Sequence, residues 1–299
     1  MRISFVVPTR NSARTLDACL ASLRTQTHPD VEVLVVDNGS TDATTEIAAR
    51  HADQVLQWGP ERSAQRNHGT DRSTGDVVVF IDSDMVLEPH IATQIHDRFT
   101  ARPEVGALII PERSFGDGFL ARCRQLEKHL YVGDEAVESP RAFRREIIDK
   151  LGGWDEKLTA AEDWDLADRT REVTTVGRVT AWIWHDEGHI KLRATFAKKR
   201  YYGRWIDQYV RMHADSSGSK FARTALLRKP GSLLRHPMLT AGLATLKLTE
   251  AAGLVMGIRD SRAAASASPS AGSASAGSAS AGSASAGSAS AGSASAGTR

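Results

Sequence analysis

Short apolar segments alternate with amphipathic segments through the first half of the chain. The apolar segments are rich in Val and Ile and mostly continuous, as in strands that are buried on both faces of a parallel sheet. We expect strands at residues 3–7, 31–36, 55–58, 77–81 and 105–110. Strands and helices that alternate at these intervals predict a doubly wound α/β fold with a mostly parallel sheet flanked by helices.

Helix start signals follow the first two predicted strands. Asn11 or Ser12 can cap a helix after the first strand, and one of residues 40–42, Ser-Thr-Asp, can cap a helix after the second. We therefore expect each helix to begin directly behind the polar residues that end a strand.

Polar clusters follow three of the predicted strands, at residues 8–11, 37–42 and 82–84. Ligands of doubly wound sheets bind beyond the carboxyl ends of the strands, so these clusters predict one common crevice. None of them contains Gly-x-Gly-x-x-Gly, which disfavours a dinucleotide-binding Rossmann site.

The second half of the chain is strand-like again at residues 173–176 and 179–184, and after residue 190 it becomes helical and basic. A long, weakly polar helix is predicted at 238–258, with Lys247 and Glu250 near its middle. Each of these charges costs about 2.5 to 3.5 kcal/mol at the centre of a bilayer, so we do not expect the helix to span one.

Two other environments remain open for the 238–258 helix. It can pack within a soluble protein, or it can lie on a membrane surface as a peripheral contact. Basic residues that would help it to lie on a membrane are Arg223, Arg228, Lys229 and Arg235.

Composition and charge limit the classes of protein to which the chain can belong. A hydrophobic content of 41% and a formal net charge of +2 describe a soluble globular protein. The charge is uneven, because residues 1–189 hold 22 basic and 32 acidic residues, whereas 190–236 hold 12 basic and two acidic ones. The basic segment predicts an anionic partner, or else it neutralises the acidic body across an internal interface. No nucleic-acid recognition motif accompanies it, so we expect no nucleic-acid partner.

Residues 263–299 differ from the rest of the chain. They are Ala, Gly, Ser and Thr with one Pro and a terminal Arg, and they contain five copies of Ala-Gly-Ser-Ala-Ser at 271–295. Such a segment cannot bury enough apolar area to offset its ordering entropy, so we expect a disordered tail.

The cysteines and the amino-terminus point to a cytoplasmic location. Cys19 and Cys123 lie in apolar helical patterns without the spacing of a disulfide framework or a zinc motif. The first apolar run is too short for the apolar region of a signal peptide.

The strongest candidate for chemistry is the acidic pair Asp82 and Asp84, at the end of the strand predicted at 77–81. Alternate residues of an extended segment point to opposite sides, so one carboxylate can bind a divalent ion while the other reaches a sugar or a metal-bound water. The alternative is a loop turn that caps the following helix.

Several segments, in their order along the chain, resemble family 2 glycosyltransferases of the GT-A fold. They are SFVVPTRN at 4–11, VVDNGSTD at 35–42, RSAQRNHG at 62–69, GDVVVFIDSD at 75–84, RAFRRE at 141–146, GGWDE at 152–156 and AEDWDL at 161–166. The resemblance covers roughly residues 3–190. It implies a GT-A glycosyltransferase domain at 1–190, with a Rossmann-like, mixed and mostly parallel sheet flanked by helices. A basic helical extension at 191–262 and the tail at 263–299 follow.

The resemblance also implies roles for single residues. The expected nucleotide-sugar contacts are Pro8, Thr9, Arg10, Asp37, Arg66 and Asp82, the expected metal ligands are Asp84 and Asp82, and the expected catalytic base is Asp163. We interpret the neighbouring Glu162 as structural, because Thr159 and Glu162 have the spacing of a capping box.

Further candidates lie downstream. His185 is a candidate third metal ligand, with His189 as a weaker one, and an imidazole ligand would favour Mn²⁺ modestly over Mg²⁺. Lys199, Arg200 and Arg204 are candidate diphosphate contacts, or else they form a solvated helix face. Trp154, Trp164 and Trp182 stack on a sugar or belong to the core, and we expect at least two of them in the core.

Together these features predict a metal-dependent, inverting glycosyltransferase. A divalent ion would offset the charge that builds on the departing nucleotide diphosphate, and a carboxylate would take the proton of the attacking acceptor hydroxyl. The chain lacks the Gln-x-x-Arg-Trp signature of processive synthases, so transfer of a single sugar is expected. A UDP-type donor and a glycan or glycolipid acceptor are favoured. The alternatives are transfer to a polyprenyl phosphate and a non-catalytic scaffold that binds a nucleotide or glycan.

Overall fold

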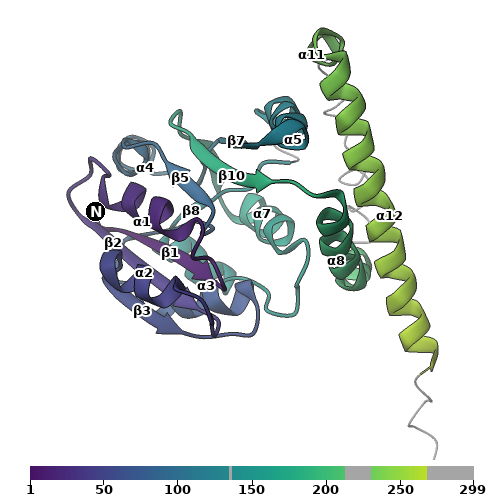
Figure 1. Ribbon diagram of the computed structural model, residues 1–299. Helices are drawn as coiled ribbons and strands as arrows, with labels where there is room; N and C mark the ends of the chain where they lie inside the picture. Colours follow the sequence, from purple (N-terminus) through teal and green to yellow (C-terminus); the bar gives the residue numbers. More distant parts are fainter. Residues whose placement is uncertain (135–136, 213–229, 268–299) are drawn as a thin grey trace, which may run out of the picture.

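A computed structural model describes residues 1–134, 137–212 and 230–267 of the chain (Figure 1). Among these residues, the central element is a seven-stranded sheet in the order β3-β2-β1-β4-β8-β6-β9. Its strands are β1 (Ile3–Thr9), β2 (Val31–Asp37), β3 (Gln54–Gln57), β4 (Val77–Phe80), β6 (Val105–Ile109), β8 (Ala142–Arg144) and β9 (Thr175–Arg178). Only the pairs that β8 makes with β4 and β6 are antiparallel. The sheet is therefore mixed and mostly parallel, as the sequence predicts.

Helices cover both faces of this sheet. They are α1 (Leu16–Arg24), α2 (Thr44–His51), α3 (Arg62–Arg72), α4 (Ile91–Ala101), α6 (Arg145–Leu151) and α7 (Glu162–Val173). Alternate residues of β1 enter different cores, because Phe5 packs with α1 and α4 while Val6 belongs to the core of the α6 and α7 face. The continuous apolar strands that the sequence shows are thus explained by burial on two sides.

A second, three-stranded sheet has the order β5-β10-β7. It contains β5 (Met85–Leu87), β7 (Glu112–Asp117) and β10 (Ile183–His189), and β7 leads directly into α5 (Gly118–Tyr131). The strands expected at 173–176 and 179–184 are found later, as β9 at Thr175–Arg178 and as β10. The sequence analysis missed β5, β7 and β8.

The helix caps differ from those that we expected. The residues at the cap positions of α1, α2 and α7 are Thr15, Ala43 and Ala161, and none makes a side-chain cap hydrogen bond. Asn11 instead joins the two loops, because its Oδ1 accepts a hydrogen bond from the backbone N–H of Thr41 at 2.8 Å. Asn11 and Ser12 therefore do not cap α1, whereas Asp42 satisfies the start of α2, because its Oδ1 accepts a hydrogen bond from the backbone N–H of Thr44 at 3.0 Å.

The carboxyl-terminal part of the described chain is helical. It contains α8 (Leu192–Met212), α11 (Pro230–Arg235) and α12 (Pro237–Ala267). The predicted helix at 238–258 is thus present and longer, and residues 263–267, which we expected in the tail, continue it. Residues 268–299, including the repeats, lie outside the described residues, as do Lys220, Arg223, Arg228 and Lys229.

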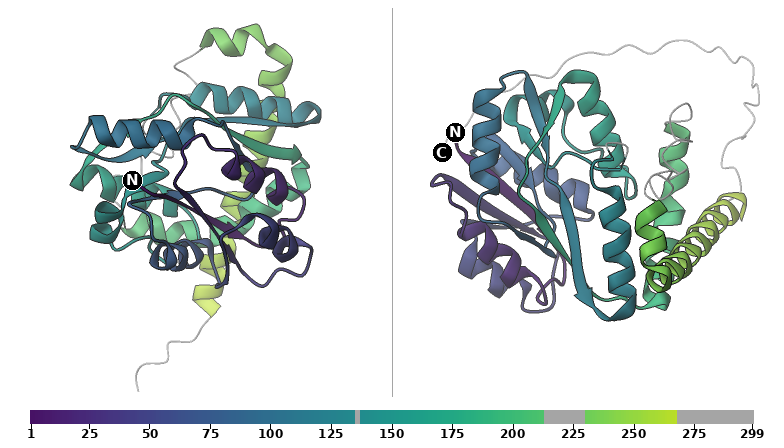
Figure 2. Two further views of the ribbon diagram at one scale, coloured as in Figure 1. Left: turned by 90° about the vertical axis from the view of Figure 1, so that its left-hand side faces the viewer. Right: turned by 90° about the horizontal axis from the view of Figure 1, so that it is seen from above.

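Helix α12 lies along α8 at the margin of the molecule, and its first half packs against α5 (Figures 1 and 2). Glycines allow the two long helices to approach closely. A Cβ on Gly253 would lie 2.6 Å from the carbonyl oxygen of Phe196, and one on Gly257 would lie 2.1 Å from that of Arg200. Any side chain at these two positions would push α12 away from α8.

Buried charges also join α12 to α5. Lys247 and Glu250 of α12 pair with each other, Lys247 contacts Glu127, and Glu250 contacts Arg124. Burial alone raises the pKa of Glu250, but the facing Arg124 and Lys247 outweigh burial and lower this pKa to about 2. Both charges in the middle of α12 therefore have partners within the protein.

Helix α12 is also long and apolar enough to cross a bilayer, a criterion that the packed helix of a soluble protein can meet as well.

We expect Gly257→Val to destabilise the protein by about 2 kcal/mol, because the new side chain overpacks the contact between α8 and α12. Ala252→Val is the matched control, since Ala252 is exposed on the same helix. Denaturant unfolding of both variants measures the difference. Equal stability of the two variants would contradict close packing at Gly257.

Candidate functional site

The site begins where β1 and β2 end side by side. Thr9 is in register with Asp37, and its hydroxyl donates a hydrogen bond to the Asp37 Oδ1 at 3.0 Å. The backbone N–H of Ser40 donates to the other carboxylate oxygen of Asp37 at 2.8 Å. Pro8, Thr9 and Asp37 are buried, whereas Arg10 is exposed. These four of the six expected nucleotide contacts therefore meet where β1 and β2 end. There the carboxylate of Asp37 already accepts hydrogen bonds from Thr9 and Ser40.

Arg66 lies at the centre of the site. Its side chain is only 1% exposed, and it projects from α3 between the end of β4 and the start of α7. The Nη2 donates to Asp82 Oδ1 at 2.8 Å, and the Nη1 donates to Asp163 Oδ1 at 3.2 Å. The guanidinium also lies 4.2 Å from the ring centroid of Trp154. Arg66 therefore connects the first acid of the 82–84 pair to the expected base, a role that the sequence analysis missed.

Asp82 is surrounded by cations. Arg141 lies 3.5 Å from its second carboxylate oxygen and 2.6 Å from Glu112, which in turn is 3.3 Å from Lys128. Burial raises the pKa of Asp82, but the charges of Arg66 and Arg141 outweigh burial and hold this pKa far below its ordinary value. Asp82 is thus a permanent anion whose two oxygens face arginines.

Asp84 faces His185 across the small sheet. The pairing of β10 with β5 sets His185 opposite Met85, and its Nε2 lies 3.1 Å from Asp84 Oδ2. The Oδ1 of Asp84 and the Nδ1 of His185 are buried and have no hydrogen-bond partner. These two side chains would offer one oxygen and one nitrogen to a divalent ion, and the unpartnered Asp84 oxygen fits that role.

The expected set of three metal ligands is not assembled. In the described part of the chain, no group of three or more His, Cys, Asp or Glu side chains is arranged around one point. Asp82 turns to Arg66 and Arg141, and His189 lies farther along β10 beside Gly118. Asp84 and His185 are therefore the metal candidates that the structure brings together.

Glu162 and Asp163 begin α7 and point to different partners. The expected capping box is absent, because Glu162 accepts a hydrogen bond from the Arg62 Nη2 at 2.7 Å instead. Burial and the neighbouring charge of Asp163 raise the pKa of Glu162. The side chain of Asp163 is 46% exposed, so it is accessible to a reactant while Glu162 is not.

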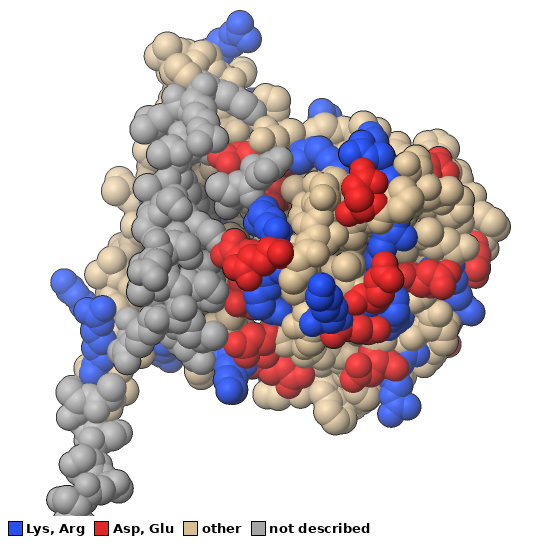
Figure 3. Space-filling view, turned by 180° about the vertical axis from the view of Figure 1, so that it is seen from behind, with Lys and Arg blue, Asp and Glu red and all other residues tan. Residues whose placement is uncertain are grey.

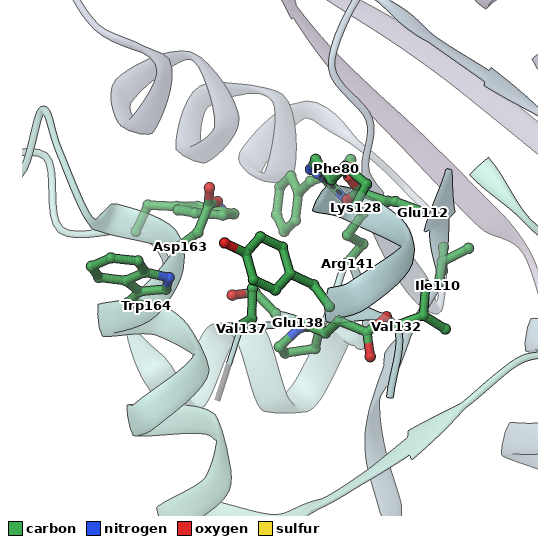
Figure 4. Close-up of a pocket in the computed structure, with 14 residues that line it drawn as sticks. Phe80, Ile110, Glu112, Lys128, Val132, Val137, Glu138, Arg141, Asp163 and Trp164 are labelled. Carbon is green, nitrogen blue, oxygen red and sulfur yellow. Dashed lines mark hydrogen bonds and ion pairs between the residues drawn. The ribbon is translucent and has the colours of Figure 1, made fainter. Parts of the chain in front are cut away.

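A cavity of about 160 Å³ opens beside Asp163 (Figure 4). Asp163 and Trp164 lie on one side of it, and Lys128, Glu112 and Arg141 lie on the other. Aromatic rings complete the lining, namely those of Phe80, Tyr131 and Trp154. Rings together with charged hydrogen-bonding groups suit a sugar, which has apolar faces and polar edges.

Several cavity residues were not among the candidates. Arg141 belongs to the 141–146 segment, so its motif was a signal that we did not use. Lys128 and Tyr131 come from α5, where the sequence shows no motif.

Two further cavities continue from the first and share Trp164 with it. One, of about 390 Å³, lies between the start of α7 and the helices α8 and α12, and the other, of about 470 Å³, is lined by Lys191, Lys198 and Lys199. Lys199 lines both, as expected of a residue near the site.

Arg200 and Arg204 do not reach these cavities. They pair with Asp260 of α12, at 2.7 Å and 3.3 Å. In the structure their charges hold α8 to α12, and their expected contact with the diphosphate stays a prediction.

The three tryptophans have different surroundings. Trp154 is buried in the core beneath Arg66, and Trp182 stacks under the guanidinium of Arg113 at 4.0 Å. Trp164 lines all three cavities. Trp154 also borders the first cavity, so Trp164 and Trp154 are the tryptophans that are placed to meet a ligand.

Known proteins share both the sequence pattern and the fold. The sequence model of glycosyl transferase family 2 matches residues 4–152, about half of the chain. The pre-mycofactocin glycosyltransferase of Mycobacterium tuberculosis is 28% identical over 287 residues, which cover 89% of this chain and 57% of that protein. The matches cover between 13% and 57% of the lengths of the curated relatives.

Two solved structures have a similar architecture. The mannosyltransferase PcManGT from Pyrobaculum calidifontis, in complex with GDP-Man and Mn²⁺, is 22% identical, with a TM-score of 0.54 over 89% of this chain and 76% of that one. Residues 1–349 of S. aureus TarS, in complex with UDP-GlcNAc, are 16% identical, with a TM-score of 0.50 over 88% and 92% of the two chains. The chain has the GT-A fold and belongs to glycosyl transferase family 2.

Proposed function

We propose that this protein is a metal-dependent, inverting glycosyltransferase that moves a single sugar from a UDP-type nucleotide diphosphosugar to an acceptor hydroxyl. The observation that carries the proposal is the Arg66 bridge, which holds Asp82 beside Asp163, the acid that lines the first cavity. Family membership supports the reaction class, and the cavity beside Asp163 is lined as a sugar site requires.

The donor lies along the carboxyl edge of β1, β2 and β4 in this proposal. Thr9 and Asp37 mark the base end, and Asp84 marks the diphosphate end. Structures of similar fold hold GDP-Man in one case and UDP-GlcNAc in the other, which supports a nucleotide-sugar donor. Lys199 is the remaining candidate for a diphosphate contact from α8.

Asp84 and His185 would hold the divalent ion, Mn²⁺ or Mg²⁺. When bound, such an ion offsets the negative charge that develops on the departing diphosphate. Asp82 does not need to bind the ion for this, because Arg66 and Arg141 fix it as a carboxylate beside the sugar site.

Asp163 acts as the general base. Its exposed carboxylate accepts the proton of the acceptor hydroxyl while the acceptor oxygen attacks the anomeric carbon and the bond to the diphosphate breaks. Attack from the side opposite to the leaving group inverts the anomeric centre. Arg66 orients Asp163 through one oxygen, and the raised pKa of the buried Glu162 makes that residue unsuited to remain a free anion there.

The acceptor is a lipid-linked or surface-glycan precursor, and the enzyme works in the cytoplasm at the inner face of the plasma membrane, in cell-envelope glycan biosynthesis. The basic character of residues 190–236 and the apolar α12 support this setting.

A nucleotide should stabilise the full chain against heat when the metal is present. At about 100 times its dissociation constant a ligand adds about 2.7 kcal/mol, which raises Tm by a few degrees. We expect the shift with UDP and Mn²⁺, and not with GDP, dTDP or CDP. Asp84→Ala should abolish the metal-dependent part of the shift, whereas no shift with any nucleotide would contradict the donor site.

Asp163→Asn should lower sugar transfer by about 10² to 10⁴-fold, since the amide cannot accept the proton, and should leave nucleotide binding unchanged. Asp168→Asn, on the same helix, is the control and should retain activity. An Asp163→Asn variant that keeps most of its activity would instead indicate a polyprenyl-phosphate acceptor, because a phosphate attacks without a base.

Arg66→Met should destabilise the fold by about 3 to 5 kcal/mol, because it removes a buried cation and leaves the half-buried Asp82 with only the more distant Arg141. Arg72→Met, at the exposed end of α3, is the control. Urea unfolding compares the two. If both variants are equally stable, Arg66 is not the charge that compensates Asp82.

A further inference from the structure

The outer face of α12 is apolar and exposed. Met238 and Leu248 are 76% and 72% exposed, and Val255 and Met256 are exposed as well. The positions between them on this face are small residues, Ala241, Ala244, Thr245 and Ala252, all exposed. Because the only charges of α12 between residues 238 and 256, Lys247 and Glu250, point inward, this outer face carries no charge over that length.

This face is too long to be an incidental feature. At 1.5 Å per residue, residues 238–256 extend over about 28 Å. A contiguous apolar surface of that size on a soluble protein marks a contact with another apolar phase or molecule. Packing within the protein does not account for the apolar outer face, since α8 and α5 pack against the inner side of α12.

Both ends of the outer face are basic. Arg235 precedes it, and Arg259 and Arg262 follow it. The nearby acid Asp260 is turned toward Arg200 and Arg204. Figure 3 shows basic side chains at the two ends of the column that α11 and α12 form. An apolar stripe between basic ends is complementary to a bilayer with anionic head groups.

We propose that the outer face of α12, from Met238 to Met256, binds the surface of an anionic lipid bilayer with the helix axis parallel to the membrane. A transmembrane arrangement would require Lys247 and Glu250 to leave their buried partners on α5. Pairing with a second copy is disfavoured, because parallel helices would bring Arg259 against its own copy and antiparallel helices would bring it close to Arg235.

The same helix connects the membrane to the site. Its inner side contributes Glu250 and Leu254 to the 390 Å³ cavity that Asp163 also lines. The lipid surface would therefore lie about one helix diameter, roughly 10 Å, from that cavity. This consequence rests on the proposed function, and it means that a lipid-linked acceptor can reach Asp163 without leaving the membrane.

Sedimentation of the full chain with sucrose-loaded vesicles tests the proposal. We expect binding to vesicles of phosphatidylcholine with phosphatidylglycerol, and much weaker binding to phosphatidylcholine alone. Leu248→Gln with Val255→Gln should weaken binding about tenfold. Val55→Gln, an exposed apolar residue on β3, is the matched control and should leave binding unchanged.

Arg235→Gln and Arg259→Gln should each weaken binding to the anionic vesicles about fivefold, with Arg193→Gln on α8 as the control. The assay contains neither donor nor acceptor, so its result is independent of catalysis. Three results would overturn the proposal: absence of binding to any vesicle, a dimer in sedimentation velocity that Leu248→Gln with Val255→Gln dissociates, or binding that resists alkaline carbonate, which indicates a spanning helix.

Discussion

The buried guanidinium of Arg66 is the interaction on which the site depends. Asp82 and Asp163 come from distant parts of the chain, and the proposed reaction uses both as anions within one small volume. Two carboxylates this close repel each other unless a cation lies between them. Arg66 provides that cation, and because it is buried, its own charge requires both acids in turn. The arginine and the two carboxylates are therefore stable only together.

The fold holds Arg66 in place from two directions. Gly69, one turn further along α3, has no side chain, and a Cβ there would lie 2.4 Å from Val6 of β1, so the helix lies directly on the sheet. On the other side, Trp154 covers the guanidinium. The site is thus built on α3 and the sheet, and α7 is attached to it through Asp163 and through the pair of Glu162 with Arg62. This arrangement leaves Asp163 as the acid of α7 that is open to the cavity.

The sequence predicts the central sheet well because its strands are continuous and apolar, as β1, β2 and β4 show. It does not reveal β7, whose buried Ser114 alternates with charged and aromatic residues that resemble a loop. The cap predicted at Asn11 is wrong for a related reason, whereas Asp42 does accept a hydrogen bond from the first backbone N–H of α2. Asn11 has the right side chain for a cap, but its Oδ1 accepts a hydrogen bond from the neighbouring loop instead.

Prediction of the site from the sequence is limited in the same way, because contacts between distant parts of the chain are not visible in it. Asp82, Asp84 and Asp163 stand in recognisable segments, whereas His185 ends an apolar run, and the structure places all four around one edge of the sheet. The sequence does not reveal which side chain each charged residue pairs with. In the structure Arg66 pairs with two acids and Arg200 pairs with Asp260, and no motif names these partners. Tertiary contacts determine which side chains pair, and neither a motif nor a residue spacing specifies those contacts.

Helix α12 illustrates why composition alone left its environment open. The cost of Lys247 and Glu250 in a membrane depends on the direction in which they point, and the structure turns both toward α5. The inner side then needs close packing, which Gly253 and Gly257 permit against α8. Nothing in that packing requires Leu248 or Val255 on the opposite side, where a polar residue would serve a soluble helix better. Helix α12 is apolar on both sides, and the rest of the protein covers only its inner side. The outer side is therefore the one that we propose lies on the membrane.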